Sequence, residues 1–245
     1  MRYAILADVH SNLTALDAVL SDIEDCGGVD EVWCLGDIVG YGPDPCECVS
    51  RVRQVARVSV MGNHDAAAIG TLDLAAFNPQ AATASRWTAA RLGTEDAGYL
   101  AQLPLRARKE DFTLVHGSPR DPIWEYLLSA AAAGENLPHF TTTHCLVGHT
   151  HVPAVFVCDA EGGCNGSLLR PGSPVPLPGK GRLIINPGAV GQPRDGDPRA
   201  SYALYDSQAG LLELHRVPYD IRATQARMVE HGLPRALVAR LSRGL

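Results

Sequence analysis

The sequence predicts an α/β protein built on a parallel β-sheet. Residues 3–65 contain three repeats of one unit, a short apolar run typical of a strand followed by a polar loop. Helical patterns lie between these units. Each apolar run ends in a polar cluster. Strand, loop and helix in alternation build a parallel sheet, and ligands gather at the carboxyl ends of its strands. We therefore expect the three polar clusters to face one crevice.

The first two repeats have recognisable boundaries. A strand is expected over residues 3–7, and Asn12 can cap a helix whose end is marked by the glycines at 27–28. A second strand over residues 31–35 precedes a helix that begins at Pro45, because proline is favoured in the first helical turn.

The rest of the chain continues in the same way. Its expected elements are strands over 57–61, 105–109, 112–115, 146–147, 182–185, 202–205 and 211–215, a helix of about fifteen residues that begins at Asn78-Pro79, a helix that Thr94 caps, and a helical tail over 219–245. The segment 158–181 is dense in Gly and Pro, which predicts an exposed hairpin or loop, and its Gly179-Lys180 pair lacks the spacing of a phosphate-binding loop. No domain boundary is evident, so we expect one domain over residues 1–245.

Composition excludes two classes of protein. A formal net charge of −6 at pH 7 argues against a general nucleic-acid binder or a membrane-surface binder, because both need a basic field. The N-terminus has an apolar stretch too short for a signal peptide, and no later run reaches membrane-spanning length. We expect a cytoplasmic protein.

The cysteines are expected to be free thiols. They are seven, an odd number, and they are scattered along the chain, which suits thiols better than disulfide bridges. Cys46 and Cys48 would need a second cysteine pair to complete a four-ligand metal site. Because no such pair exists in the sequence, we expect both to pack as ordinary side chains.

Polar residues of metal-ligand type follow the predicted strands. A lone histidine is weak evidence for a metal, but residues that follow strands of one sheet should converge. Two divalent ions held close together need oxygen and nitrogen donors and a bridging carboxylate, and a set without thiolate favours Mn, Fe, Zn or Ni over copper(I). The candidates are Asp8, His10, Asp37, Asn63, His116, His149 and His151, with His64 beside them.

Five motifs resemble those of the calcineurin-like metallophosphoesterases. They are DVHSN, GDIVGYG, GNHD, HGSP and GHTH, in that order. The resemblance extends from the N-terminus to about Asp206, includes NPGAVGQPRD, and is closest to the small bacterial and archaeal phosphodiesterase branch. It implies a four-layer αββα sandwich, in which two mixed β-sheets are flanked by helices and a dinuclear metal site lies at the C-terminal ends of the strands.

The resemblance also implies roles for the candidate residues. Residues at i and i+2 of an extended segment point to the same side, so His149 and His151 can each reach a different ion while Thr150 points away. A hydroxide shared by two cations would attack phosphorus directly, and His64 would protonate the leaving group as general acid. By position, Asp8, His10 and His151 would hold the first metal, Asn63, His116 and His149 the second, and Asp37 would bridge them.

Two residues depart from the protein-phosphatase branch of that family. Gly40 stands where that branch has a carboxylate that orients the histidine, and Tyr41 stands in place of a phosphate-binding arginine. Asp65 is an alternative partner for His64, although adjacent residues in a turn often point apart. Arg194 either replaces the missing arginine at the rim of the site or, as we slightly prefer, lies in a solvated loop.

The resemblance implies an enzyme that hydrolyses phosphodiesters or small phosphorylated molecules with two divalent metal ions. The turn at residues 186–188 is expected to shape the floor of the site. Two alternatives stay open: a catalytically silent binding scaffold of the same fold, and a dinucleoside polyphosphate or protein phosphatase, which an arginine at position 41 would favour.

Overall fold

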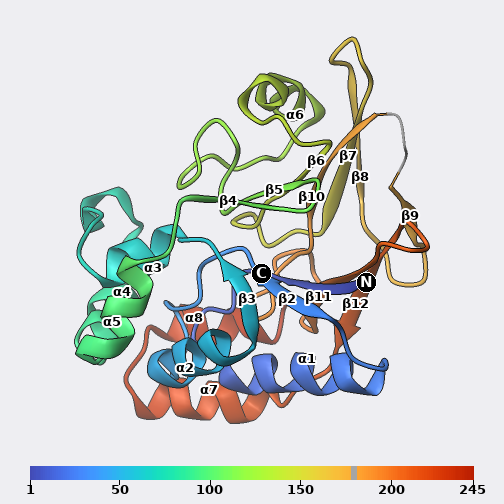
Figure 1. The fold of residues 1–245 in the computed structure, drawn as a ribbon. Coiled ribbons are helices and arrows are strands. Elements are labelled where there is room, and N and C mark those ends of the chain that lie inside the picture. Colours follow the sequence, from blue (N-terminus) through green and yellow to red (C-terminus); the bar gives the residue numbers. More distant parts are fainter. Residues whose placement is uncertain (178–180) are drawn as a thin grey trace.

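Two mixed β-sheets pack face to face and carry helices on their outer faces (Figure 1). The computed structural model describes residues 1–177 and 181–245. The four-layer αββα sandwich implied by the sequence motifs is therefore confirmed.

The first sheet contains the three parallel strands predicted from the N-terminal repeats. Its order is β3-β2-β1-β11-β12-β9, in which β1, β2 and β3 run parallel and β11 pairs antiparallel with β1. The predicted pairing of the two late strands is also correct, with Tyr202 opposite His215. The bounds are β1 Arg2–Leu6, β2 Glu31–Cys34, β3 Ala56–Ser59, β9 Val175–Pro176, β11 Ala200–Asp206 and β12 Leu211–Val217.

The second sheet has the order β4-β5-β6-β10-β7-β8. Its central strands β5, β6 and β10 run parallel, while β4 forms the predicted hairpin with β5. The bounds are β4 Arg106–Lys109, β5 Phe112–Val115, β6 His144–Leu146, β7 Ala154–Cys158, β8 Cys164–Leu168 and β10 Arg182–Asn186.

Helices cover the outside of both sheets (Figure 1). The side chain of Asn12 accepts a hydrogen bond from Ala15 N and caps α1 as predicted, whereas α5 is capped at Gly93 rather than Thr94, and α4 is shorter than expected. The bounds are α1 Leu13–Asp25, α2 Pro45–Val55, α3 Asn63–Ala68, α4 Pro79–Ala89, α5 Thr94–Ala101, α6 Ala130–Asn136, α7 Ile221–Glu230 and α8 Arg235–Leu241, with short 3₁₀ turns at Leu74–Ala76 and Leu137–His139.

Both faces of β1 are buried, which explains its unbroken apolar run. Tyr3 and Ile5 pack in the core between the two sheets, together with Leu146 of the second sheet. Ala4 and Leu6 point to the other face, into the core beneath α1 and α2. Burial on both faces is typical of parallel strands, and it fixes the register of the loop that follows β1.

The segment 158–181 contains a disulfide that the sequence analysis did not expect. Cys158 ends β7 and Cys164 begins β8, and the hairpin register places them opposite each other with Cα atoms 4.1 Å apart. The expectation that all seven cysteines are free is therefore wrong for this pair, because cross-strand pairing brings together two residues that look scattered in the sequence. Residues 178–180, which include the Gly179-Lys180 pair, lie outside the described residues.

The tail contains α7 and α8, and both pack near the site. Thr224 of α7 donates a hydrogen bond to the Asn12 side chain, and Leu237 of α8 packs in one cluster with Tyr41. In the described part of the chain, no helix is both long and apolar enough to cross a membrane.

Candidate metal centre

The seven predicted ligand side chains lie together and are buried. They come from the loops that follow β1, β2, β5 and β6 and from the start of α3. Backbone hydrogen bonds join these loops: His10 N donates to Asp37 O at 2.9 Å, and Gly148 N donates to His116 O at 2.7 Å. The parallel strands of both sheets therefore deliver their polar clusters to one place, as predicted.

The side chains form two groups of potential metal ligands that share one carboxylate. The first contains Asp8, His10, Asp37 and His151, and the second contains Asp37, His116 and His149. Asp37 Oδ2 lies 3.6 Å from His10 Nε2 and 3.3 Å from His116 Nε2. Asp37 is therefore the residue able to serve both groups.

The first group fits a cation because two histidine lone pairs face each other. His10 Nδ1 and His151 Nδ1 lie 3.2 Å and 2.6 Å from backbone carbonyl oxygens, which can only accept, so each Nδ1 carries the hydrogen. Burial lowers the pKa of both rings, which leaves them neutral. The two Nε2 atoms, each with a free lone pair, then lie 3.0 Å apart. Asp8 Oδ1 lies 3.4 Å from His151 Nε2. Such a convergence of acceptors is stabilised by a positive charge among them.

In the second group, a proton on His116 supplies that positive charge. His116 Nδ1 donates to Leu35 O, and its Nε2 lies 3.1 Å from both Asn63 Oδ1 and His149 Nδ1. Burial alone would lower the pKa of His116, but the Asp37 and Asp8 carboxylates raise it to about 9. The ring is therefore protonated near neutral pH, and a cation bound by this group would displace the proton.

We predict that metal affinity rises with pH. His116 must lose a proton to bind a cation, and Asp8, whose pKa is raised mainly by burial, must be ionised. Between about pH 7 and pH 9, displacement of the His116 proton weakens binding by about tenfold per pH unit of acidification, and below about pH 7 the proton on Asp8 makes the dependence steeper. Calorimetric titration of chelator-stripped protein with Mn²⁺ from pH 6.5 to 8.5, in two buffers of different ionisation enthalpy, measures both the affinity and the protons released. An affinity that does not change between pH 6.5 and 8.5 would contradict the prediction.

His149 and His151 reach different groups, but the predicted reason is wrong. The segment is not extended: both residues have left-handed backbone, with φ of 65° and 60°. This conformation costs a residue other than glycine about 1–2 kcal/mol, and it recurs here at Asp8, His10, Asp37 and Tyr41, with φ between 49° and 60°. Strain of this kind persists where surrounding contacts fix the backbone, and it clusters at functional sites.

His64 is buried beside the two groups, and aromatic rings hold it. Its ring centroid lies 4.3 Å from that of Tyr41 and 5.2 Å from that of Phe77, and its backbone N donates to Asp37 Oδ1 at 2.8 Å. Burial lowers the pKa of His64 to about 4. The packed rings thus hold the imidazole in place without a carboxylate partner at Nδ1.

Asp65 does not orient His64. Its two carboxylate oxygens accept hydrogen bonds from Val39 N and Gly62 N, both at 3.0 Å, so the adjacent side chains point apart. Gly40 instead approaches the ring: a Cβ at this position would lie 2.8 Å from His64 Nδ1. A carboxylate at position 40 would therefore have no room beside His64 in this arrangement.

Arg194 lies at the site rather than in a solvated loop. Its guanidinium is 5.8 Å from the Tyr41 ring centre and donates to Gln192 Oε1 at 3.0 Å. Its charge also lowers the pKa of His151, after the larger effect of burial. The preference for a solvated loop is wrong, because the chain turns back over Tyr41 after β10.

Asn186 shapes the floor of the site through the backbone, as predicted. Its Nδ2 donates to Gly148 O at 2.6 Å and to Thr150 Oγ1 at 3.0 Å, which fixes the loop that carries both histidines. Its Oδ1 accepts from Gly188 N at 2.8 Å.

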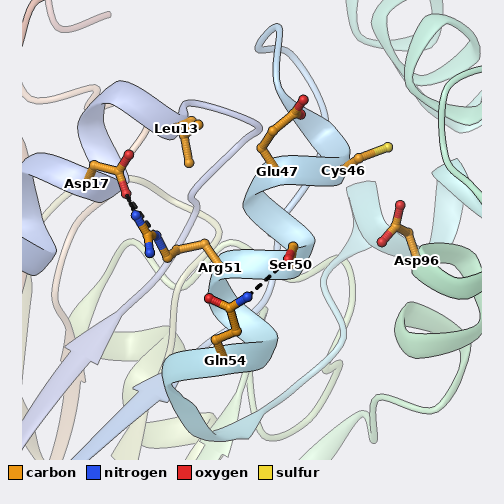
Figure 2. A pocket seen from close by; sticks show the side chains of 8 residues that line it. All are labelled: Leu13, Asp17, Cys46, Glu47, Ser50, Arg51, Gln54 and Asp96. Carbon is orange, nitrogen blue, oxygen red and sulfur yellow. Dashed lines mark hydrogen bonds and ion pairs between the residues drawn. The ribbon is translucent and has the colours of Figure 1, made fainter.

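A separate cavity of about 490 Å³ lies along α1 and α2, near α5 (Figure 2). Most of the residues that line it are charged or polar, and an ion pair between Asp17 and Arg51 spans part of its wall. Cys46 lines this cavity, while Cys48 is buried in the core, so the two thiols do not form a metal site together. None of the residues lining the cavity belongs to the Asp/His groups.

An αββα sandwich that gathers nitrogen and oxygen donors at the carboxyl ends of its strands has the layout of a metal-binding protein. The model of the calcineurin-like phosphoesterase superfamily domain matches residues 1–210, and the chain belongs to this family. It is a hydrolase that acts on phosphoester bonds, and its family is metal-dependent.

Three comparisons place the chain more closely. A crystal structure of a metallophosphoesterase from Sphaerobacter thermophilus is 52% identical, with a TM-score of 0.90 over 100% of this chain and 99% of that one. An uncharacterised protein of Methanocaldococcus jannaschii is 39% identical over 98% of this chain and 97% of its own length. A symmetrical bis(5'-nucleosyl)-tetraphosphatase of Vibrio cholerae is 31% identical, but over 54% of this chain and 49% of its own length.

Sequence reasoning pointed to Tyr41 but not to the other aromatic residues around the site. Besides Tyr41 and Phe77, the ring of Tyr126 stacks on His149 with centroids 3.9 Å apart. Tyr126 lies ten residues beyond the HGSP histidine and has no motif of its own, so its place depends on the path of the loop after β5.

Proposed function

We propose that this protein hydrolyses phosphodiesters or small phosphorylated molecules with two divalent metal ions. The observation that carries the proposal is Asp37, which belongs to both groups of buried ligand atoms. Sharing one carboxylate is what two close cations of like charge require. Mn, Fe, Zn and Ni all suit the nitrogen and oxygen donors.

The proposed ligand assignment follows the two groups. When bound, the ions would lower the pKa of a water molecule and neutralise charge on the phosphoryl oxygens. The protein's part is to hold the donors in place, with Nδ1–H groups fixed on carbonyls so that each Nε2 faces inward. Asp8, His10 and His151 would hold one ion and Asn63, His116 and His149 the other, with Asp37 between them.

His64 would act as general acid for the leaving group. Its Nδ1 is enclosed beside Gly40, which leaves Nε2 to carry the proton to the substrate. Burial lowers the pKa of His64 to about 4, so the ring needs a nearby negative charge to become protonated. The phosphate of a bound substrate supplies such a charge, which raises the histidine pKa when the substrate is in place.

Arg194 is the proposed contact for the substrate's phosphate at the rim. Its guanidinium lies against the ring of Tyr41. Tyr41 is the residue that stands in place of the arginine of the protein-phosphatase branch. An arginine held by Gln192 is ready to bind a phosphoryl oxygen. The protein would thereby bind phosphate without an arginine at position 41.

A dinucleoside polyphosphatase is the second candidate. The Vibrio cholerae relative has this activity in its name, and its similarity covers about half of each chain. The absence of an arginine at position 41 counts against this candidate. Arg194 lies beside residue 41, however, and could take the place of that arginine. The third alternative, a silent scaffold, would lack ligand positions or the acid histidine, and this chain has all of them.

A matched substrate pair tests the proposal. Bis-p-nitrophenyl phosphate and p-nitrophenyl phosphate release the same leaving group, so their rates compare diester with monoester directly. Chelator-stripped protein reloaded with Mn, Ni, Zn or Mg should hydrolyse the diester with at least one of these metals, and diadenosine tetraphosphate tests the second candidate. No hydrolysis of any of these substrates with any of these metals would support the scaffold.

A further inference from the structure

We propose that the aromatic wall of this site, defined as Phe77, Trp124 and Tyr126, binds a planar aromatic group of the substrate. The group would be a nucleobase or an aryl ring joined to the phosphate that is hydrolysed. This inference deepens the proposed function and rests on it. It assigns a substrate class to residues that lie outside the metal ligands and have no role in the proposed chemistry.

The wall contacts the site at two places. The Tyr126 ring stacks on His149 with an interplanar angle of 25° and centroids 3.9 Å apart. Phe77 lies 5.2 Å from His64 and 4.9 Å from Trp124, edge to face in both cases. One ring therefore touches a proposed metal ligand, and a second touches the proposed general acid. The wall therefore lies beside both the proposed metal ligands and the proposed general acid.

The Tyr126 side chain is half exposed beside the site. Its side chain is 49% exposed although one face lies on His149, and Leu128 two residues later is 66% exposed. Among the described residues, Tyr126 is the one aromatic side chain in the set of exposed large apolar residues. An exposed ring beside a polar site offers a surface on which a ligand ring can stack. Stacking of a base on an aromatic side chain contributes about 1–3 kcal/mol.

Hydrogen bonds within the protein hold the loop that carries Trp124 and Tyr126. Glu125 lies between Trp124 and Tyr126, and its carboxylate accepts hydrogen bonds from Ser118, Arg120 and Asn136. Trp124 N also donates to Asp121 Oδ1 at 3.1 Å. A platform fixed in this way loses little entropy when a ring binds to it.

Core packing accounts for only part of the wall. Phe77 packs against the cluster of Tyr41, Ala81 and Met228, which gives this ring a structural role as well. That cluster contains neither Trp124 nor Tyr126. The exposed ring of Tyr126 is therefore the part that a structural role explains least, and it is the first residue to test.

Binding of phosphate compounds to the Mn²⁺-loaded protein tests the inference. The probes are AMP and ribose 5-phosphate, which differ by the base, and phenyl phosphate and ethyl phosphate, which compare an aryl ring with an alkyl group. Calorimetry should show AMP binding at least about tenfold more tightly than ribose 5-phosphate. A preference for AMP but not for phenyl phosphate identifies a nucleobase, and a preference for both identifies any aromatic ring.

Variants assign the preference to the wall. Tyr126→Ala and Trp124→Leu should reduce the ratio of the two affinities to near one, whereas Tyr126→Phe keeps the ring and should keep the ratio. Trp87→Leu is the matched control for loss of an indole, because Trp87 stacks on Arg91 and His231. It packs on the same cluster as Phe77, so it also reports any effect transmitted through that cluster. Metal content is measured in each variant, since Tyr126 contacts His149. If Trp124→Leu does not fold, Tyr126→Ala alone decides.

Two outcomes separate this inference from the proposed function. Equal affinities within both probe pairs, AMP with ribose 5-phosphate and phenyl phosphate with ethyl phosphate, would overturn the aromatic wall while leaving hydrolysis intact. An unchanged ratio in Tyr126→Ala would overturn it as well. Failure to bind inorganic phosphate, together with no hydrolysis of either nitrophenyl ester, would count against the proposed function itself.

Discussion

Asp37→Asn should remove tightly bound metal from both ligand groups and abolish most turnover. The substitution keeps the shape of the side chain, and the amide oxygen can still accept from His64 N, so the fold should persist. What it removes is the negative charge next to His10 and His116. We expect the loss of metal affinity to exceed the roughly 10- to 100-fold that loss of an outer-shell partner costs.

Metal content and thermal stability both report on this change. Metal analysis of reloaded protein should find less than one tightly bound ion per chain, and Mn²⁺ should no longer raise the melting temperature. In the unmodified protein, a metal at 100 times its Kd stabilises the fold by about 2.7 kcal/mol. The matched control is Asp44→Asn, a buried carboxylate that pairs with Arg227 rather than with a histidine. Two tightly bound ions in Asp37→Asn would refute the bridging role.

The proton on His116 provides a second readout for the same variant. Burial lowers its pKa, and the charge of Asp37 is the largest influence that raises it. Without this charge, the pKa should fall, and NMR titration of the metal-free variant would show it. This readout is independent of metal binding, so it separates the loss of one charge from collapse of the site.

The convergence of the side chains that follow β1, β2 and β3 could be predicted from topology, whereas the three histidines of the second sheet were placed through the motifs. Parallel strands place their carboxyl ends on one edge, and the polar residues after β1, β2 and β3 follow directly from the order of the elements. The apolar run of β1 also predicted burial on both faces, as Tyr3 and Leu6 show. These features need only the period of the sequence and the direction of the strands.

Other features depend on how loops fold, which the sequence pattern does not contain. The left-handed backbone of His149 and His151 is imposed by Asn186 and by Asp8, whose carboxylate accepts from His149 N. The same limit applies to Arg194, which a turn after β10 brings over Tyr41.

The disulfide shows the same limit in another region. Cys158 and Cys164 are six residues apart, and their pairing depends on the register of the β7–β8 hairpin. A change of one residue in that register would place the two side chains on opposite faces. The number and spacing of cysteines therefore could not reveal the bridge.

His64→Ala should keep its metals and lose most of its turnover. General acid groups contribute about 10²- to 10⁴-fold to rate, and the loss should be largest for substrates with poor leaving groups. A p-nitrophenolate leaves without much help, whereas a sugar alkoxide needs a proton. The ratio of the two rates therefore distinguishes proton donation from phosphate binding, because loss of phosphate binding would slow both substrates equally.

The control for this variant is a histidine that is buried but remote from the site. His144 lies at the start of β6, where it packs beside Phe112, while the proposed ligands follow the end of that strand. His144→Ala should therefore lower stability without changing the ratio of the rates. Unchanged turnover in metal-loaded His64→Ala would remove this residue from the mechanism. An equal fall for both leaving groups would instead assign it to phosphate binding, with Arg194 beside it.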